Sequence, residues 1–502
     1  MPITPGGSLN SVPSPRTVAL TTNYIDFTST ATAGWAQQYL PDLMEKEAEV
    51  FGNRTVSGFL SQVGAEESMT SDQVVWSEQG RLHLAYNGQI RHLTQESGGG
   101  AGGQLGIIQD IDGNAVTTTH GIRTNDILLV ADSATTQRLL VTGFGATDNI
   151  INVQAYGAAT MTAAGFTVAA SSDGSTVGIT ILVVGSEWGK GVDGQAGNAA
   201  GPTASQPQHT SFNNKPIIIK DHYHINGSDT SAIGWVEVSG EDGAGGYLWY
   251  LKAEGETRMR FTDYLEMAMV ESELGVAGST LADNFVSGAG NSFGTEGLFS
   301  AISTRGNLAS GIDPLLAPAT NLGEFDSILN EFDNQGAIEE NMMFLDRNTA
   351  LAVDDMLAAM NSYGAGGTSF GVFNNSEDMA LNLGFSGFRR GSYDFYKTDW
   401  KYLNDKGSRG SINSRDLLTN IRGVFIPAGV SSVYDQLMGK NMKRPFLHVR
   451  YRASQTDDRR MKTWTTGSVG GSVTSDLDAM QVHYLSERCL ITQGANNFML
   501  LN

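Results

Sequence analysis

Cysteine is almost absent from this chain of 502 residues, which contains Cys489 alone. A single thiol forms no intramolecular disulfide and no zinc cluster built from several cysteines, and Cys489 is expected to be a buried neutral thiol. No stretch approaches about 18 uninterrupted apolar residues, so no membrane-spanning helix is expected. The opening residues, MPITPGG, have neither a basic end nor an apolar core, so no secretory signal is expected. These absences predict a soluble, cytosolic protein.

Charged residues are also few, at 17% of the chain, while apolar residues make up 40%. This balance is typical of a packed globular protein rather than a disordered one. The chain has 61 glycines, which indicates many turns and β-rich segments rather than a helical bundle. Its length exceeds one ordinary domain, so two or three substructures are expected.

The net charge of −21 is spread unevenly. Residues 385–465 hold sixteen basic residues against seven acids, which gives +9 and leaves −30 for the rest; residues 324–355 hold nine acids against Arg347. The basic window could bind nucleic acid, although the acidity of the whole chain would oppose this. Complementary charged surfaces between subunits and a solvated mixed face remain open alternatives. The arginines expected at such subunit contacts are Arg389, Arg390, Arg459 and Arg460.

The first 50 residues are rich in Pro, Ser and Thr as far as Ala33. Apolar residues then recur at helical spacing, at Trp35, Tyr39 and Leu43. The pattern predicts an arm that is extended and then briefly helical. Because such an arm buries little surface by itself, we expect it to lie over a neighbouring subunit.

Two stretches of small residues, 97–103 and 189–205, bracket a series of short strand candidates. Their spacing and turn signals such as Asp112-Gly113-Asn114 predict a small β-barrel or sandwich. Linkers on both sides predict that it is inserted into a host strand pair. Strands are expected at residues 105–111, 127–130, 138–144, 150–156 and 177–184, and again at 216–223 and 234–238.

A long helix is expected to begin near Glu254, because Phe261, Leu265 and Ala268 share one helical face. Gly275 marks its end, so about 20 residues would form a rod of about 30 Å. Two further helices are expected at residues 324–332 and 349–362, and short apolar runs follow at 423–426 and 446–451. This order predicts an α+β fold.

Motifs that could carry chemistry are incomplete. Residues 290–294 and 367–371 match Gly-x-Ser-x-Gly, but neither has the strand and helix that a nucleophile elbow needs. His222 and His224 would share a strand face, where two imidazoles supply at most half a coordination shell. Residues 110–114 resemble the start of a calcium loop without its closing acid, and a hairpin turn is expected there instead. No catalytic, cofactor-binding or metal-ligating residue, and no cofactor, is therefore predicted.

Three C-terminal segments carry a resemblance: GSYDFYKTDW at 391–400, RPFLHVRYR at 444–452 and YLSERCLITQGANNF at 484–498. They resemble the major capsid proteins of tailed double-stranded DNA phages, which have the Hong Kong 97-type capsid fold, and most of all those of the crAss-like phages. Elsewhere the resemblance rests on the order of the parts. The chain lacks one feature of some relatives, a long charged N-terminal helix that acts as a built-in scaffold. Assembly with a separate scaffolding protein and assembly with none therefore both remain open.

The resemblance implies an α+β chain divided into five parts. These are an N-terminal arm, an E-loop hairpin, an inserted small β-barrel, a peripheral domain with a spine helix, and an axial domain. The expected bounds are 1–50 for the arm, 51–97 and 208–252 for the E-loop and adjoining strands, 98–207 for the barrel, 253–300 and 431–502 for the peripheral domain, and 301–430 for the axial domain.

The resemblance also implies a function. The chain would be a major capsid protein, not an enzyme, that self-assembles as hexamers and pentamers into an icosahedral phage head around double-stranded DNA. The implied partners are further copies of the chain, a portal, decoration or head-auxiliary proteins, packaged DNA bound without sequence specificity, and a separate scaffolding protein, with no membrane. The chain would be made and assembled in the host cytoplasm and would end in the virion. Lys190, Lys215 and Lys220 lie in or near the expected hairpin but match no Lys–Asn crosslinking motif.

Three alternatives remain. An encapsulin-like compartment would share the fold, but the large insert at 98–207 argues against it. A phage fibre or receptor-binding component is disfavoured by the long helix near Phe261 and by the lack of repeats. A hydrolase is the most distant alternative, because neither Gly-x-Ser-x-Gly match has the required context.

Overall fold

The computed structural model has a mixed α+β fold, as predicted, and divides into two compact units. Unit 1 comprises Met1–Val74 and Asn214–Asn502, and unit 2 comprises Val75–Asn213. The expected N-terminal arm (1–50) and the expected strand at 234–238 lie outside the described residues. The structure describes residues 58–60, 65–79, 85–93, 102–116, 120–145, 147, 149–166, 178–191, 209–228, 248–275, 294–313, 315–336, 338–361, 387–413, 420–428, 430–435, 440–469 and 473–502.

Unit 2 contains a closed six-stranded barrel. Alternate residues point inward, and the side chains of Leu128, Val130, Leu139 and Val141 are fully buried in its core. All five strands expected in the insert are confirmed. Residues 85–92, the first barrel strand, were expected in the hairpin outside the insert. Instead this strand pairs with the second and the last strand of the barrel in sequence and so closes it. In barrel order the strands are β3 (Ala85–His92), β4 (Gly103–Asp110), β7 (Ile150–Ala155), β6 (Thr136–Phe144), β5 (Asp126–Ala131) and β8 (Ile179–Ser186).

Two narrow ribbons each consist of a single strand pair. One joins β2 (Val74–Gln79) to β9 (His209–Asn214) on either side of the barrel in sequence, and the other joins β16 (Val430–Asp435) to β17 (Lys440–Pro445). Neither ribbon pairs with any other strand in the part of the chain that the structure describes.

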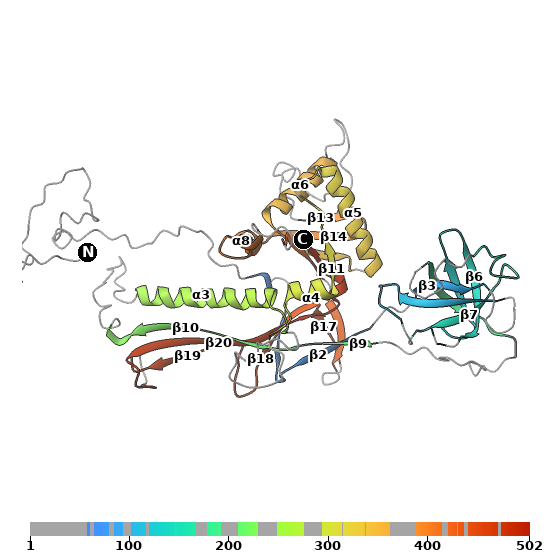
Figure 1. The fold of residues 1–502 in the computed structure, drawn as a ribbon. Helices are drawn as coiled ribbons and strands as arrows, with labels where there is room; N and C mark the ends of the chain where they lie inside the picture. The colour runs from blue at the N-terminus through green and yellow to red at the C-terminus, as the bar shows by residue number, and fades with distance from the viewer. Residues whose placement is uncertain are drawn as a thin grey trace, which may run out of the picture. The chain divides into compact units, whose positions relative to one another are not determined.

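In unit 1, a long helix lies along a five-stranded sheet (Figure 1). The helix, α3 (Leu248–Glu271), begins six residues before the expected start and would be about 36 Å long at 1.5 Å per residue. Its Phe261 and Leu265 pack against Val482 and Tyr484 of the sheet. The strands are β1 (Ala65–Met69), β18 (Leu447–Arg452), β20 (Ala479–Thr492) and β10 (Ile217–Asn226) in order, with β19 (Lys462–Gly467) also paired to β20.

A second sheet of unit 1 has six strands. Helices α5 (Pro318–Gln335) and α6 (Arg347–Asn361), both expected from the sequence, pack on it through a core that includes Phe325, Phe395 and Phe425. Proline in the first turn of α5 and Gly336 at φ 69° beyond its last turn explain where that helix begins and ends. In order, the strands are β11 (Asn307–Ala309), β21 (Met499–Leu501), β15 (Gly423–Pro427), β12 (Glu340–Leu345), β14 (Tyr393–Asp399) and β13 (Gly387–Arg390).

The two sheets of unit 1 share one hydrophobic core. Phe344 and Trp400 contribute to it from the side of the six-stranded sheet, and Leu447 and Leu490 contribute from the five-stranded sheet. Three short helices complete this region: α4 (Leu298–Arg305), α7 (Lys401–Asn404) and α8 (Arg409–Asn413). Strand β21 was expected with the peripheral domain, but it belongs to the six-stranded sheet, so the end of the chain crosses from one sheet to the other.

Candidate functional site

The segment that follows the first 57 residues is fixed firmly to unit 1. Phe59 is 3% exposed and stacks on Trp400 with ring centroids 4.3 Å apart. The Glu266 carboxylate on α3 accepts hydrogen bonds from the backbone N–H groups of Gly58 at 2.6 Å and Leu60 at 3.0 Å. Burial raises the pKa of Glu266, and the hydrogen bonds from Gly58 and Leu60 partly oppose this rise. Residues 58–60 are therefore held to the rest of unit 1 by an aromatic contact and a half-buried carboxylate.

Strand β1 is held to its sheet by ion pairs. Glu67 pairs with Arg450 at 2.8 Å, and Glu66 pairs with Arg460. Arg488, next to Cys489 on β20, lies 3.7 Å from Glu66, and burial lowers the pKa of this guanidinium. The Glu67–Arg450 pair reinforces the ladder between the parallel neighbours β1 and β18. The pairs of Glu66 connect β1 to residues beyond β18.

The four arginines expected at subunit contacts all pair within the chain. Acids brought close by the fold already lie beside all four arginines, and the expectation that these arginines also pair between subunits stays a prediction. Two partners are distant in the sequence, Asp326 from Arg390 and Glu66 from Arg460, whereas Asp394 follows Arg389 closely. The pairs are Arg389–Asp394 at 3.6 Å, Arg390–Asp326 at 2.5 Å, Arg459–Glu487 at 2.6 Å, and Arg460–Glu66.

The two expected imidazoles lie on one exposed face of β10. His222 is opposite His483 of β20, with ring centroids 5.9 Å apart, and Trp464 stacks on the other side of His483 at 5.1 Å. Burial and then the neighbouring His222 lower the pKa of His483. His224 instead bonds Gln481 at 3.1 Å. Across the described ranges, no three His, Cys, Asp or Glu side chains are arranged to hold a metal ion.

The remaining motifs are turns or lie outside the described residues. Asp110 accepts the backbone N–H of Asn114 at 2.7 Å, and Gly113 has φ 89°, which is the expected hairpin turn. Residues 290–293 and 367–371 of the two Gly-x-Ser-x-Gly matches are outside the described residues. Cys489 is buried as expected, and burial raises the pKa of its thiol to about 12. Within the described chain, no helix has both the length and the apolar character needed to cross a membrane.

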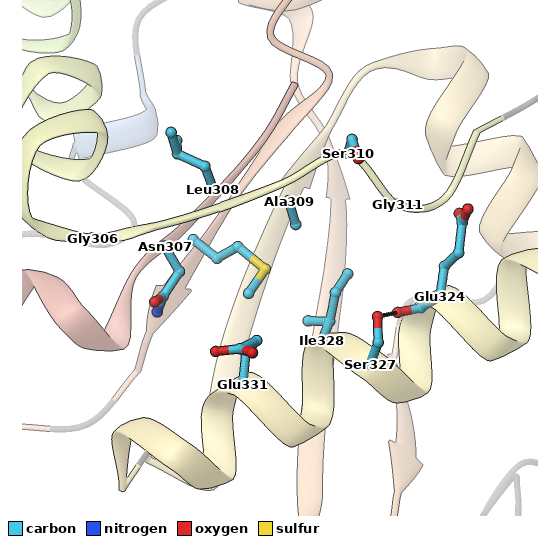
Figure 2. A pocket seen from close by; sticks show the side chains of 11 residues that line it. Gly306, Asn307, Leu308, Ala309, Ser310, Gly311, Glu324, Ser327, Ile328 and Glu331 are labelled. Atoms are coloured by element: carbon cyan, nitrogen blue, oxygen red, sulfur yellow. Dashed lines mark hydrogen bonds between the residues drawn. The ribbon is translucent and has the colours of Figure 1, made fainter. Parts of the chain in front are cut away.

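An open groove that no sequence pattern predicts lies beside the edge of the six-stranded sheet (Figure 2). Its volume is about 560 Å³, and it lies between the edge strand β11 and helix α5. Met499 and Ile328 form an apolar floor, and Glu324 and Glu331 lie along α5. The groove exists because β11 and the residues after it have small side chains, at Ala309, Ser310 and Gly311, where larger ones would fill the space.

The loop that borders this groove is rigidly held. The Arg422 guanidinium donates to the carbonyl oxygens of Ser310 at 2.7 Å and Ile312 at 3.1 Å, and also to that of Asn502 at 2.7 Å. Glu324 accepts the backbone N–H of Ile312 at 2.8 Å, which supports Ile312 at the unusual φ of 61°. A β-branched residue in this region is strained, so the surrounding hydrogen bonds maintain the shape of the groove.

Comparisons with known proteins give structural likenesses of low score. No family model matches the chain, and no curated protein matches it. The capsid structure of cyanophage P-SCSP1u matches with a TM-score of 0.41 at 7% identity, covering 96% of this chain and 98% of that one. A chain of Microbacterium phage Oxtober96 matches with a TM-score of 0.36 at 8% identity, covering 94% and 98%. The mature capsid of bacteriophage PhiM1 matches at 0.31 and 8%, covering 60% and 74%.

TM-scores below 0.5 at such identities are too low to decide the fold or the function of this chain. A shared fold would in any case leave the function to be argued from the site. The functional proposal for this chain therefore rests on its own residues and geometry.

Proposed function

We propose that this chain is the major capsid protein of a tailed phage, a shell subunit rather than an enzyme. The observation that carries the proposal is the pair of two-stranded ribbons, β2–β9 and β16–β17, which pair with no other strand in the described residues. An isolated two-stranded ribbon is marginally stable in water and needs a further surface to pack on. Copies of the same chain in a closed shell provide such surfaces.

Exposed apolar side chains on the β2–β9 ribbon and on the edge strand β11 support this interpretation. Val75 of the β2–β9 ribbon is 62% exposed, and Leu308 of the edge strand β11 is 53% exposed. Single exposed apolar residues are ordinary on monomers, but here they coincide with unpaired strand edges, which other chains readily extend. Subunits that meet through several such surfaces can form the large total interface of a permanent assembly.

The fixed start of unit 1 suits an arm that reaches a neighbour. Phe59 and Glu266 hold the chain at one point. An arm formed by the preceding residues and bound to a neighbouring subunit would therefore be attached firmly to its own subunit. We assign the arm to 1–50, the E-loop and adjoining strands to 51–97 and 208–252 without β3, and the inserted barrel to 98–207 together with β3. The peripheral domain is assigned to 253–300 and 431–502 without β21, and the axial domain to 301–430 together with β21.

In the wider proposal, the chain has the Hong Kong 97-type fold, and α3 is the spine helix of the peripheral domain. Hexamers and pentamers of the chain would form the icosahedral head around double-stranded DNA. A portal, decoration or head-auxiliary proteins and a separate scaffolding protein would be its further partners. The narrower likeness to the crAss-like group stays a prediction from the C-terminal segments.

Electron microscopy of the purified full-length chain tests the proposal. Closed shells of uniform size, with or without an added scaffolding protein, are the expected result. Shells that enclose host enzymes in place of DNA when made in an infected cell would favour the encapsulin-like alternative. A chain that stays monomeric at high concentration, even with the other head proteins of its phage, would refute the proposal.

A further inference from the structure

The groove beside β11 has the chemistry of a receptor for a basic side chain. Met499 and Ile328 form its nearly fully buried apolar floor, and the exposed Leu308 on its rim offers apolar surface to an aliphatic stem. Glu331 is an exposed carboxylate with no ion-pair partner among the described residues. Glu324 is the second carboxylate on the same side. A lysine can bury its four-carbon stem along such a surface while its ammonium group stays with the acids.

The charge of helix α5 extends this preference. Residues 318–335 contain four acids and no basic residue, so the helix carries −4. Two of these acids, Asp326 and Asp333, are already engaged with Arg390 and the Tyr393 hydroxyl. Arg390 balances the charge of Asp326, whereas the neutral Tyr393 hydroxyl leaves that of Asp333 in place. Glu324 and Glu331 line the groove, so two of the three remaining negative charges of α5 lie at the cavity.

A complementary feature lies on another side of the same layer of unit 1. In the view of Figure 1, α8 lies to the left of strands β13 and β14 and α5 lies to their right. Residues 401–413, which form α7, α8 and the turn between them, have three basic residues against one acid, a balance of +2. Lys406 is exposed on this turn and has no ion-pair partner in the described part of the chain. Ile412 of α8 is 53% exposed.

The turn that carries Lys406 is held in shape. Asp405 accepts the backbone N–H of Gly407 at 2.9 Å through its carboxylate, and its carbonyl accepts the N–H of Ser408 at 3.0 Å. The Ser408 hydroxyl donates to the carbonyl of Tyr402 at 2.7 Å. A side chain presented by an ordered turn loses less conformational entropy on binding than one on a loose loop.

We propose that the Lys406 turn of one copy docks into the β11–α5 groove of the next copy. The Lys406 ammonium meets Glu331, Glu324 adds negative charge two helical turns away along α5, and Ile412 packs near the exposed Leu308 on the rim. The inference rests on the proposed function and deepens it, because it names one pair of surfaces through which neighbouring subunits recognise each other.

The two surfaces differ, so the contact is heterologous. Each copy offers the turn to one neighbour and the groove to the other, and such head-to-tail contacts produce rings when the rotation closes. Opposite net charges on the two surfaces steer the encounter and oppose the reversed orientation. A ring of this kind would be one closed group of subunits within the shell.

Crosslinking of assembled particles tests the juxtaposition directly. The double variant Lys406→Cys/Glu331→Cys, treated with a short bismaleimide, should give a covalent ladder of subunits that ends at the ring size. Either single-cysteine variant should give no ladder and serves as the matched control. Cys489 remains in all three chains, because its buried thiol, with its pKa raised to about 12, should stay unreactive.

The outcomes separate the docking from the proposed function. A ladder in the double variant alone supports the docking. Well-formed particles without a ladder overturn it, while the shell function stands. A wild-type chain that forms no particles under any condition overturns the shell function itself, and the docking with it.

Charge exchange gives a second and independent measurement. Lys406→Glu and Glu331→Lys should each slow assembly about tenfold at low salt, where charges are least screened. The assembly rate of the double variant Lys406→Glu/Glu331→Lys should recover to within about twofold of wild type, because opposite charges again face each other. Lys220→Glu, an exposed lysine on β10, is the control and should assemble normally. A double variant no faster than the slower single variant would overturn the proposal.

Discussion

The barrel of unit 2 and the six-stranded sheet of unit 1 differ in their strand edges: the barrel is closed, and the sheet is open. In the barrel every strand has two neighbours, so no edge is left for another chain to extend. The six-stranded sheet ends at β11 and β13, and the open edge at β11 borders the groove. The closed region is therefore suited to folding on its own core, and the open one to recognising a partner.

The largest expected effect concerns the core shared by the two sheets of unit 1. Trp400 is 5% exposed and contacts the rings of Phe59, Phe299 and Phe344. Trp400→Ala should lower the free energy of unfolding of unit 1 by about 3–5 kcal/mol, while the barrel keeps its own stability. Hydrogen exchange of the amides in each unit measures both effects. Trp464→Ala, at a ring 37% exposed, is the control and should cost less than about 1 kcal/mol. Equal loss of protection in the barrel would show that the two units do not fold independently.

The barrel offers the converse test. A Cβ at Gly88 would lie 2.2 Å from the carbonyl oxygen of Gly106 on the neighbouring strand, so Gly88→Ala should force β3 and β4 apart. The expected loss is about 1–3 kcal/mol, confined to amides of the barrel. At Gly185 of β8, an added Cβ meets no atom within 4 Å, so Gly185→Ala should have little effect. Similar losses at both glycines would contradict the steric explanation.

A smaller effect is expected from the carboxylate that anchors the start of unit 1. Burial raises the pKa of Glu266 above its usual value of 4.5, so the folded state holds this proton to a higher pH than the unfolded state does. The contribution of Glu266 to stability is therefore largest at acid pH and is lost as the pH rises through the raised pKa. Wild type should lose stability relative to Glu266→Gln as the pH rises from about 4.5 towards 7.

Thermal unfolding of the two chains over this pH range measures the difference. Glu273→Gln, at an exposed carboxylate after the end of α3, is the matched control and should follow wild type at every pH. A constant difference between wild type and Glu266→Gln would show that Glu266 is not the group that titrates.

The smallest effect should come from an arginine that already pairs within the chain. Arg389 is 60% exposed in its side chain and lies 3.6 Å from Asp394. Arg389→Glu should change stability by about 0.5 kcal/mol or less and leave the assembly rate within about twofold of wild type. If it slowed assembly as strongly as Lys406→Glu is expected to do, Arg389 would be a subunit contact after all, as the uneven charge of the sequence first suggested.

Elements with a local signal could be predicted from the sequence. The barrel strands are short apolar runs separated by turn signals, and α3 repeats apolar residues at helical spacing through Phe261 and Leu265, so both were expected. The candidate site could not be predicted in this way. The groove depends on Met499, Ile328 and Ala309, which come from three separate segments of the chain.

Contacts between residues far apart in the sequence could not be predicted either. His222 meets His483 because β10 and β20 are neighbours, and no pattern around either residue indicates that partner. Conversely, the excess of basic residues in 385–465 was real, but composition alone could not tell that Arg390 and Arg459 already have acidic partners.

The sequence by itself determined the kinds of elements and their order: a β-rich insert, a long helix and a mixed C-terminal body. These follow from side-chain periodicity, which acts over a few residues. Only the tertiary structure decided that β3 closes the barrel, that β21 joins the six-stranded sheet, and that Lys406 and Glu331 are left without ion-pair partners among the described residues. Those outcomes depend on which distant segments compete for the same edge or the same charge, and that competition is settled only when the whole chain packs.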